Sequence, residues 1–298
     1  MIDLRYHIAS LIAVFLSLGL GILIGSTIVG NDIMVDQQQK MINSLEEQFY
    51  VLREKEASLM AENEYKSKIL GNYENYSQSL LPYLVEDRLM DYKVAIVVSG
   101  DNEIPAGMIN ALSIAGAQVV SKTIILSNLS LDDSELRTRV MEFYDMGEEA
   151  TVEEMKQQIA ASVAAIITNN GSPELIRFLQ ENGLVKFSGS NTIPVNGIIL
   201  IGGSNNLANF FAQSFDTALI KHLSETGHRV FGVEHSLVTY SCMTHYQENN
   251  ISTIDNIDLS PGQISLILAM DGEQGHYGIK ETAQKFIPSL PVNSFKGR

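Results

Sequence analysis

The longest apolar run of the chain lies near its N-terminus. No charged residue occurs between Ile8 and Val29. A helix of about 22 residues is about 33 Å long, which is enough to cross the hydrocarbon core of a bilayer. The run is longer than the core of a signal peptide, and no A-x-A-like cleavage site follows it. The pattern therefore predicts a retained transmembrane anchor over residues 1–30.

Small residues recur at every fourth position of this run. They are Ala9, Ala13, Ser17, Gly21 and Gly25. This spacing places them on one face of a helix, where the backbone of a second helix can approach closely. The stripe indicates a span that dimerises in the membrane. The alternative is a helix whose small residues face lipid, because alanine and glycine are common in such spans.

Charge indicates the orientation and the partners of the chain. Arg5 precedes the span and the first basic residue after it is Lys40, which favours a cytoplasmic N-terminus in the cell membrane and an extracytoplasmic body. The 35 acidic and 20 basic residues give a net charge of −15. This balance argues against binding to nucleic acid or to an anionic lipid surface.

The next segment, residues 31–82, is polar and carries a seven-residue apolar repeat. Its clearest part is the series Leu45, Leu52 and Leu59. The register places Val35, Ile42, Phe49, Glu56, Asn63 and Leu70 at a, and Gln38, Leu45, Leu52, Leu59, Lys66 and Tyr73 at d. This repeat predicts a parallel, two-stranded coiled-coil stalk, and Asn63 at an a position favours two strands. The alternative is a single amphipathic helix packed on its own globular domain.

Residues 83–287 alternate apolar runs with helical patterns. Strands are expected at residues 92–98, 117–126, 163–168, 196–201 and 229–233, and helices at 105–116, 131–146, 151–162, 172–180 and 206–224. Such alternation predicts a mostly parallel sheet covered on both faces. The fold class is therefore α/β: an N-terminal transmembrane helix, a long coiled-coil helix, then a mostly parallel sheet flanked by helices. Residues 288–298 are expected to form an extended or disordered tail.

Catalytic motifs are missing from the sequence. The turn at Gly202 and Gly203 is the nearest approach to a phosphate-binding loop, but it has neither the G-x-G-x-x-G spacing nor a Walker lysine. The sequence also contains neither G-x-S-x-G nor H-E-x-x-H. We therefore expect a protein that is not an enzyme.

Polar residues nevertheless gather where strands are expected to end. Ligands of parallel sheets bind beyond the carboxyl ends of the strands. The candidates for such a crevice are Ser99, Asp101, Gly202, Gly203, Asp255, Asn256, Asp258 and His276. They would suit a cation, a peptide or a glycan, and hard oxygen donors favour Ca²⁺ or Mg²⁺ over copper. The alternative is that Asp258 and Ser260 only cap a helix over residues 262–270, which Pro261 opens.

A second set of candidate ligands contains sulfur. Cys242, Met243 and His245 lie within four residues of one another, and thiolate and thioether are donors suited to Cu(I). On one helix, however, Met243 would point about 100° away from the face that Cys242 and His245 share. We favour the alternative that Cys242 is a small core residue. As the only cysteine, it excludes an internal disulfide framework and a cysteine-rich zinc site.

Both ends of the chain carry the motifs of a known family. These are Met1–His7 followed by the apolar span, then Ile251–Asp258, Ser260–Ala269 and Gly275–Ile279. Together they resemble the MctB-type copper transport protein family. The resemblance implies copper homeostasis or efflux through the cell envelope, with copper as the possible bound metal. Related members resemble coiled-coil envelope proteins that act with the cell-wall remodelling machinery.

Three functions follow from these patterns. The first is a copper-handling envelope protein that depends on its cysteine, methionines or histidines. The second is a dimeric scaffold that regulates enzymes of peptidoglycan remodelling, and the third is an α/β domain that binds a small solute. A single apolar helix cannot enclose a pore. The residues themselves therefore favour a membrane-tethered dimer.

Overall fold

The structure, a computed structural model, describes residues 4–290, apart from the side chains of residues 28–33. Residues 1–3 of the N-terminal motif and most of the tail predicted at 288–298 lie outside the described residues. The chain divides into two compact units, residues 1–71 and residues 72–298. The boundaries predicted at residues 30, 82 and 287 stay predictions.

The first unit consists of helix α1 (Leu4–Val85), which continues into the second unit. Its segment Leu4–Thr27 is long and apolar enough to cross a membrane. The seam residues predicted for the stalk, Leu45, Leu52 and Leu59, are 47%, 61% and 50% exposed. These apolar side chains lie open along the helix, as they would before a second helix covers them. Whether the stalk dimerises remains a prediction.

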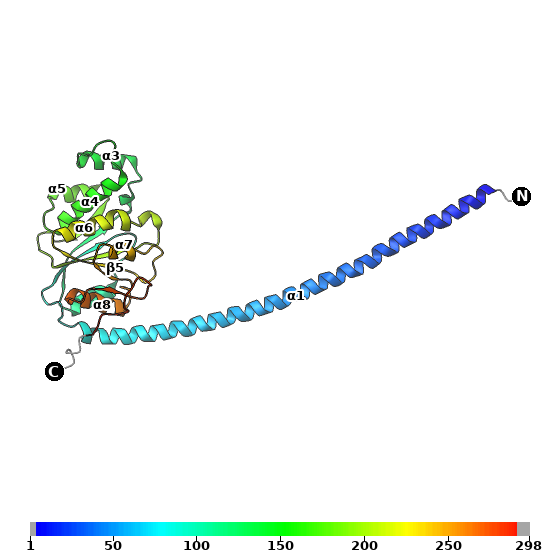
Figure 1. The fold of residues 1–298 in the computed structure, drawn as a ribbon, viewed down its shortest axis with the longest axis horizontal. Helices are drawn as coiled ribbons and strands as arrows, with labels where there is room; N and C mark the ends of the chain where they lie inside the picture. Colours follow the sequence, from blue (N-terminus) through cyan, green and yellow to red (C-terminus); the bar gives the residue numbers. More distant parts are fainter. Residues whose placement is uncertain (1–3, 291–298) are drawn as a thin grey trace. The chain divides into compact units, whose positions relative to one another are not determined.

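A mostly parallel sheet forms the centre of the second unit (Figure 1). Its seven strands within the described residues are β1 (Lys93–Val98), β2 (Gln118–Ile125), β3 (Val185–Gly189), β4 (Gly197–Gly202), β5 (Arg229–Glu234), β6 (Ser252–Ile254) and β7 (His276–Tyr277). They lie in the order β3-β2-β1-β4-β5-β6-β7, and only the β2–β3 pair is antiparallel. The strand order reverses at β1, which makes this a doubly wound sheet with its switch point between β1 and β4.

Two helical layers cover the sheet. The end of α1 packs on one face with α2 (Ala106–Ile114) and α8 (Ser260–Asp271). The other face carries α3 (Ser134–Phe143), α4 (Val152–Ile167), α5 (Pro173–Glu181), α6 (Thr217–Glu225) and α7 (Met243–Gln247), together with the turns η1 (Ser127–Ser130), η2 (Leu207–Asn209) and η3 (Ala212–Asp216). Along β1, Ala95 and Val97 face this second layer, whereas Ile96 faces the first. This alternation buries both faces and explains the continuous apolar strand.

The predicted fold class is confirmed, but two predicted elements are wrong and one strand was missed. The strand expected at 163–168 is the second half of α4, which a capping box of Thr151 and Glu154 begins. The antiparallel strand β3 was not predicted. The helix expected at 206–224 is interrupted, because η2 and the π-helical turn η3 precede α6.

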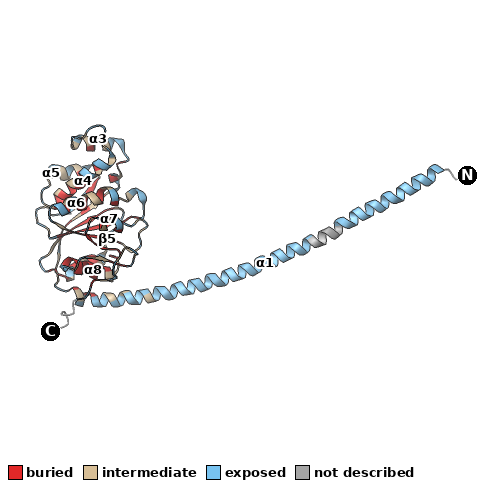
Figure 2. Cartoon of the chain, viewed as in Figure 1, coloured by how far each residue is buried: buried red, intermediate tan, exposed pale blue. Residues whose placement is uncertain are grey.

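The last turns of α1 are tied to the second unit. Leu81 and Val85 are buried there, and so is Leu89 just after the helix. Figure 2 shows that most of the described part of α1 is exposed. The carboxylate of Glu74 accepts hydrogen bonds from the backbone nitrogen and the hydroxyl of Ser260 at 3.0 and 2.5 Å. Ser260 begins α8, so a negative charge lies at the positive end of that helix dipole. The prediction that the Ser260 side chain caps α8 is therefore wrong, because its hydroxyl donates to Glu74.

Candidate functional site

Glu234 and Asp216 are buried carboxylates that lie inside the domain, near the carboxyl ends of the central strands. Glu234 is the last residue of β5 and is 0% exposed, and Asp216 ends η3 and is 1% exposed. The loop after β5 leads into α7, which supplies Tyr246 against the same region. A buried carboxylate is costly unless it is paired and hydrogen-bonded. The two carboxylates meet this requirement in different ways.

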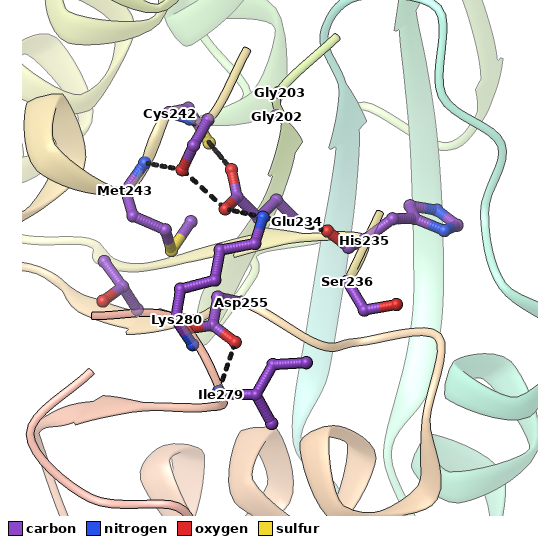
Figure 3. A network of polar contacts seen from close by, with 12 residues as sticks. Gly202, Gly203, Glu234, His235, Ser236, Cys242, Met243, Asp255, Ile279 and Lys280 are labelled. Carbon is purple, nitrogen blue, oxygen red and sulfur yellow. Dashed lines mark hydrogen bonds and ion pairs between the residues drawn. The ribbon is translucent and has the colours of Figure 1, made fainter. Parts of the chain in front are cut away.

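Glu234 is held by an ion pair and three further hydrogen bonds. Its Oε1 lies 2.6 Å from Lys280 Nζ and 2.7 Å from Ser241 Oγ (Figure 3). Its Oε2 accepts from the backbone nitrogen and the thiol of Cys242 at 2.8 and 3.3 Å. Lys280 lies beyond β7, so this pair ties the end of β5 to the C-terminal loop. This hydrogen-bonded ion pair holds the end of β5 and the C-terminal loop together inside the domain.

Asp216 is hydrogen-bonded only by neutral groups. Ser99 Oγ donates to its Oδ1 at 2.6 Å, and Tyr246 OH donates to its Oδ2 at 2.7 Å. Burial raises the pKa of Asp216 to about 6, although both hydrogen bonds act to lower it. The carboxyl group of Asp216 is therefore expected to lose its proton at a higher pH than an exposed aspartate.

Cys242 lies between these carboxylates. Its side chain is fully buried. Burial raises the pKa of the Cys242 thiol well above 9.0, and the charges of Glu234 and Asp216 add to this effect. A thiol in this position stays protonated and is a poor metal ligand, because thiolate is the form that binds metals. A side chain at Gly202 would overlap Tyr246 OH and Cys242 Sγ, so glycine is required there.

The other two predicted copper ligands, Met243 and His245, differ in burial. Met243 is 1% exposed and packs in the hydrophobic core. His245 is half-buried, with its Nδ1 4.0 Å from Glu248 Oε2, and its ring faces Phe210. Within residues 4–290, no three His, Cys, Asp or Glu side chains form a group that could hold a metal ion.

Most of the predicted crevice carboxylates bind loops of their own domain. Asp101 Oδ1 accepts from Ser204 Oγ at 2.5 Å. Asp255 accepts from the backbone nitrogens of residues 279 and 280 at 2.7 and 2.9 Å. Asp258 accepts from the backbone nitrogen and hydroxyl of Ser236 at 2.7 and 2.6 Å. The prediction that Asp258 caps α8 is therefore wrong, and these carboxylates fix the loops that follow β4, β5 and β7.

At the switch point, the loops that follow β1 and β4 contact one another. Asn102 Nδ2 donates to the carbonyl oxygens of Gly202 and Gly203 at 3.0 and 2.6 Å. A Cβ atom at Gly100, where φ is +81°, would approach the Gly203 carbonyl oxygen to 2.6 Å. A cleft of about 350 Å³ lies beside this region, and the predicted crevice residues do not line it. Its lining is Ser127, Asn128, Ser130, Asp132, Asp133, Leu136, Arg139, Ala208 and Asn209.

The last two predicted crevice residues, His276 and Asn256, have different environments. His276 Nδ1 pairs with Thr253 Oγ1 at 3.0 Å, within the β6–β7 ladder rather than beyond it. Asn256 is 0% exposed, and neither polar atom of its side chain has a hydrogen-bond partner among the residues that the structure describes. Whether the predicted set lines one crevice stays a prediction.

The chain is a doubly wound α/β protein. Its described residues include one N-terminal apolar helix that is long enough to cross a bilayer. The sequence matches the family described as copper transport outer membrane protein, MctB, over residues 1–288. The chain belongs to this family, so the resemblance noted from its terminal motifs is confirmed. It is thus a copper-transport-related membrane protein. No curated protein was found to match the chain.

Proposed function

We propose that the chain serves copper homeostasis as a non-enzymatic membrane tether that is dimeric through its stalk. One observation carries this proposal: α1 combines an apolar segment of membrane-spanning length with exposed leucines at seven-residue spacing. A single span cannot enclose a pore, so the chain would act by presenting its α/β domain outside the cell rather than by conducting the metal itself.

The chemistry of the domain supports a tether rather than a copper carrier. The two sulfur-containing residues predicted as copper ligands, Cys242 and Met243, are both fully buried. The thiol is neutral and donates to Glu234. Loading copper there would require loss of this proton and opening of the core. Copper would therefore be the cargo of the system in which this chain acts, and not a ligand held at Cys242.

Labelling of Cys242 tests this part of the proposal. We expect a thiol-reactive reagent to modify Cys242 slowly in the native protein, at a rate that stoichiometric Cu(I) does not change. The reason is that the thiol is buried and protonated. The measurement is mass spectrometry of the labelled full chain, with the protein unfolded in urea as the control for rapid labelling. Fast native labelling that Cu(I) suppresses would instead assign copper binding to Cys242.

A charge in the stalk seam tests the dimer. We expect Leu52→Glu to weaken self-association of residues 31–298 about tenfold or more, because it places an unpaired carboxylate at a d position. Sedimentation equilibrium measures the change. The matched control is Val51→Glu, which adds the same charge at a neighbouring exposed position outside the seam. A wild-type protein that stays monomeric at high concentration would contradict the proposed dimer.

A further inference from the structure

The last turns of α1 carry two different apolar faces. One face packs on the domain of the same chain, where Leu81 is 3% exposed, Val85 is 0% exposed and Leu84 is half-buried. The other face is open to solvent. It is formed by Tyr73, Tyr76, Leu80 and Tyr83, which are 67%, 64%, 36% and 78% exposed. We call these four residues the tyrosine face.

The spacing of these residues makes the tyrosine face continuous. Positions 73, 76, 80 and 83 follow the i, i+3, i+7, i+10 pattern that gathers side chains on one side of a helix. Positions 77, 81, 84 and 88 form a neighbouring stripe, about 100° further around the helix. This second stripe lies against the domain. The helix therefore has one covered side and one open apolar side.

The heptad register explains this division. Tyr73 and Leu80 continue the d series of Leu45, Leu52 and Leu59 at the same seven-residue spacing. Lys66 occupies the d position between Leu59 and Tyr73. Tyr76 and Tyr83 fall at g. The a positions of this segment, Ser77 and Leu84, are half-buried. The domain of the same chain thus covers the a side of the register, and the d and g side remains open.

We infer that the tyrosine face binds the same face of a second copy of this chain, so that the dimer interface continues from the stalk onto the α/β domains. This inference rests on the proposed dimer and extends it. A partner helix on the d and g side would lie against α1, and each α1 would be held between its own domain and the second copy.

The chemistry of the face favours a second copy. Two chains that each carry a net charge of −15 repel one another. The tyrosine face carries no charged residue, and Glu74, the one charge between residues 72 and 85, is turned to Ser260. Tyrosine is enriched in protein interfaces, because it buries a large apolar area with little loss of side-chain freedom. The Glu74–Ser260 contact also fixes the helix to the domain and so pre-organises the face.

Single cysteines test the inference in the full-length, membrane-embedded protein. Leu80→Cys samples the tyrosine face, and Asn75→Cys is the matched control, since it is exposed on the opposite side of the same helix. Leu52→Cys reports on the stalk separately. Each is placed in a Cys242→Ser background and, in parallel, in the wild-type background, where Cys242 is buried. A disulfide requires two Cα atoms within about 7 Å. Mild oxidation is therefore expected to give at least tenfold more disulfide dimer for Leu80→Cys than for Asn75→Cys.

The three variants separate the possible failures. Cross-linking at residue 52 but not at residue 80 would overturn this inference and leave the stalk dimer standing. Equal cross-linking at residues 75 and 80 would show random collision and would also overturn it. Absence of cross-linking at both 52 and 80 would reject the proposed dimer itself. As a test without a new thiol, Tyr76→Glu is expected to weaken self-association about tenfold. The far-ultraviolet circular dichroism of the protein is expected to stay unchanged, which would show that the fold is intact.

Discussion

Replacing Lys280 with methionine is expected to lower the free energy of unfolding of the α/β domain by about 3–5 kcal/mol. Glu234 is fully buried, and Lys280 supplies the one opposite charge bonded to it. Methionine keeps the apolar length of the side chain but leaves the Glu234 carboxylate unpaired in the core. The remaining donors, Ser241 and Cys242, are neutral and cannot replace the lost charge.

Urea unfolding of the full-length protein in detergent measures this loss. The chain has no tryptophan, so the near-ultraviolet circular dichroism of its tyrosines is the natural signal. Lys285→Met is the matched control, because Lys285 is exposed and, within residues 4–290, its amino group hydrogen-bonds only to Ser289, at 3.5 Å. The double variant Glu234→Gln, Lys280→Met is expected to be more stable than Lys280→Met alone, since it removes the buried unpaired charge. A loss below about 1 kcal/mol for Lys280→Met would mean that the Glu234–Lys280 pair contributes little to the stability of the domain.

The fold was predictable where a pattern had one interpretation. The continuous apolar runs of β1, β4 and β5 are bounded by glycine or polar residues, and each is a strand. Residues 163–168 are also apolar, but a short apolar run fits a buried helix as well as a strand. The deciding signal lay at Thr151 and Glu154, whose capping box begins a helix long enough to include those residues. Strand β3 is short and mostly exposed, with lysine and serine among its five residues, which hides it from hydropathy.

The buried ionic site was harder to predict. Glu234 and Lys280 are 46 residues apart, and no local motif joins them. One signal was present for Glu234, because an acidic residue directly follows the apolar strand residues 230–233. Asp216 had no such signal, since it lies in a π-helical turn within a segment predicted as regular helix. Contacts between residues that lie in separate segments of the chain can be predicted only when the order of the strands in the sheet is known.

The crevice candidates illustrate a second limit. Asp101, Asp255 and Asp258 were chosen because they follow strands, and the structure does place them there. Sequence spacing cannot tell a carboxylate that awaits a ligand from one that fixes a loop. In this domain each of the three accepts hydrogen bonds from the chain itself. Their role as ligands of a cation, peptide or glycan stays a prediction.

Asp216 is expected to make the stability of the domain fall as the pH rises from about 4 to about 6. Its pKa is raised from 3.8 to about 6 in the folded state, because burial disfavours the charged form. Within this window the folded protein binds more protons at Asp216 than the unfolded chain does, so stability decreases with increasing pH and levels off above about 6. The difference between the two pKa values corresponds to about 3 kcal/mol.

Asparagine at this position isolates the effect. Asp216→Asn cannot ionise, so its stability relative to wild type is expected to increase by about 3 kcal/mol between pH 4 and pH 7. Urea unfolding at each pH measures it, and the comparison of the two proteins cancels the other carboxyl groups. Among these, Glu154 has a lowered pKa and contributes with the opposite sign. Ser99→Ala should steepen the wild-type dependence, because Ser99 Oγ donates to the charged form of Asp216. Parallel pH profiles for wild type and Asp216→Asn would show that the pKa of Asp216 is the same in the folded and the unfolded protein, and would contradict this prediction.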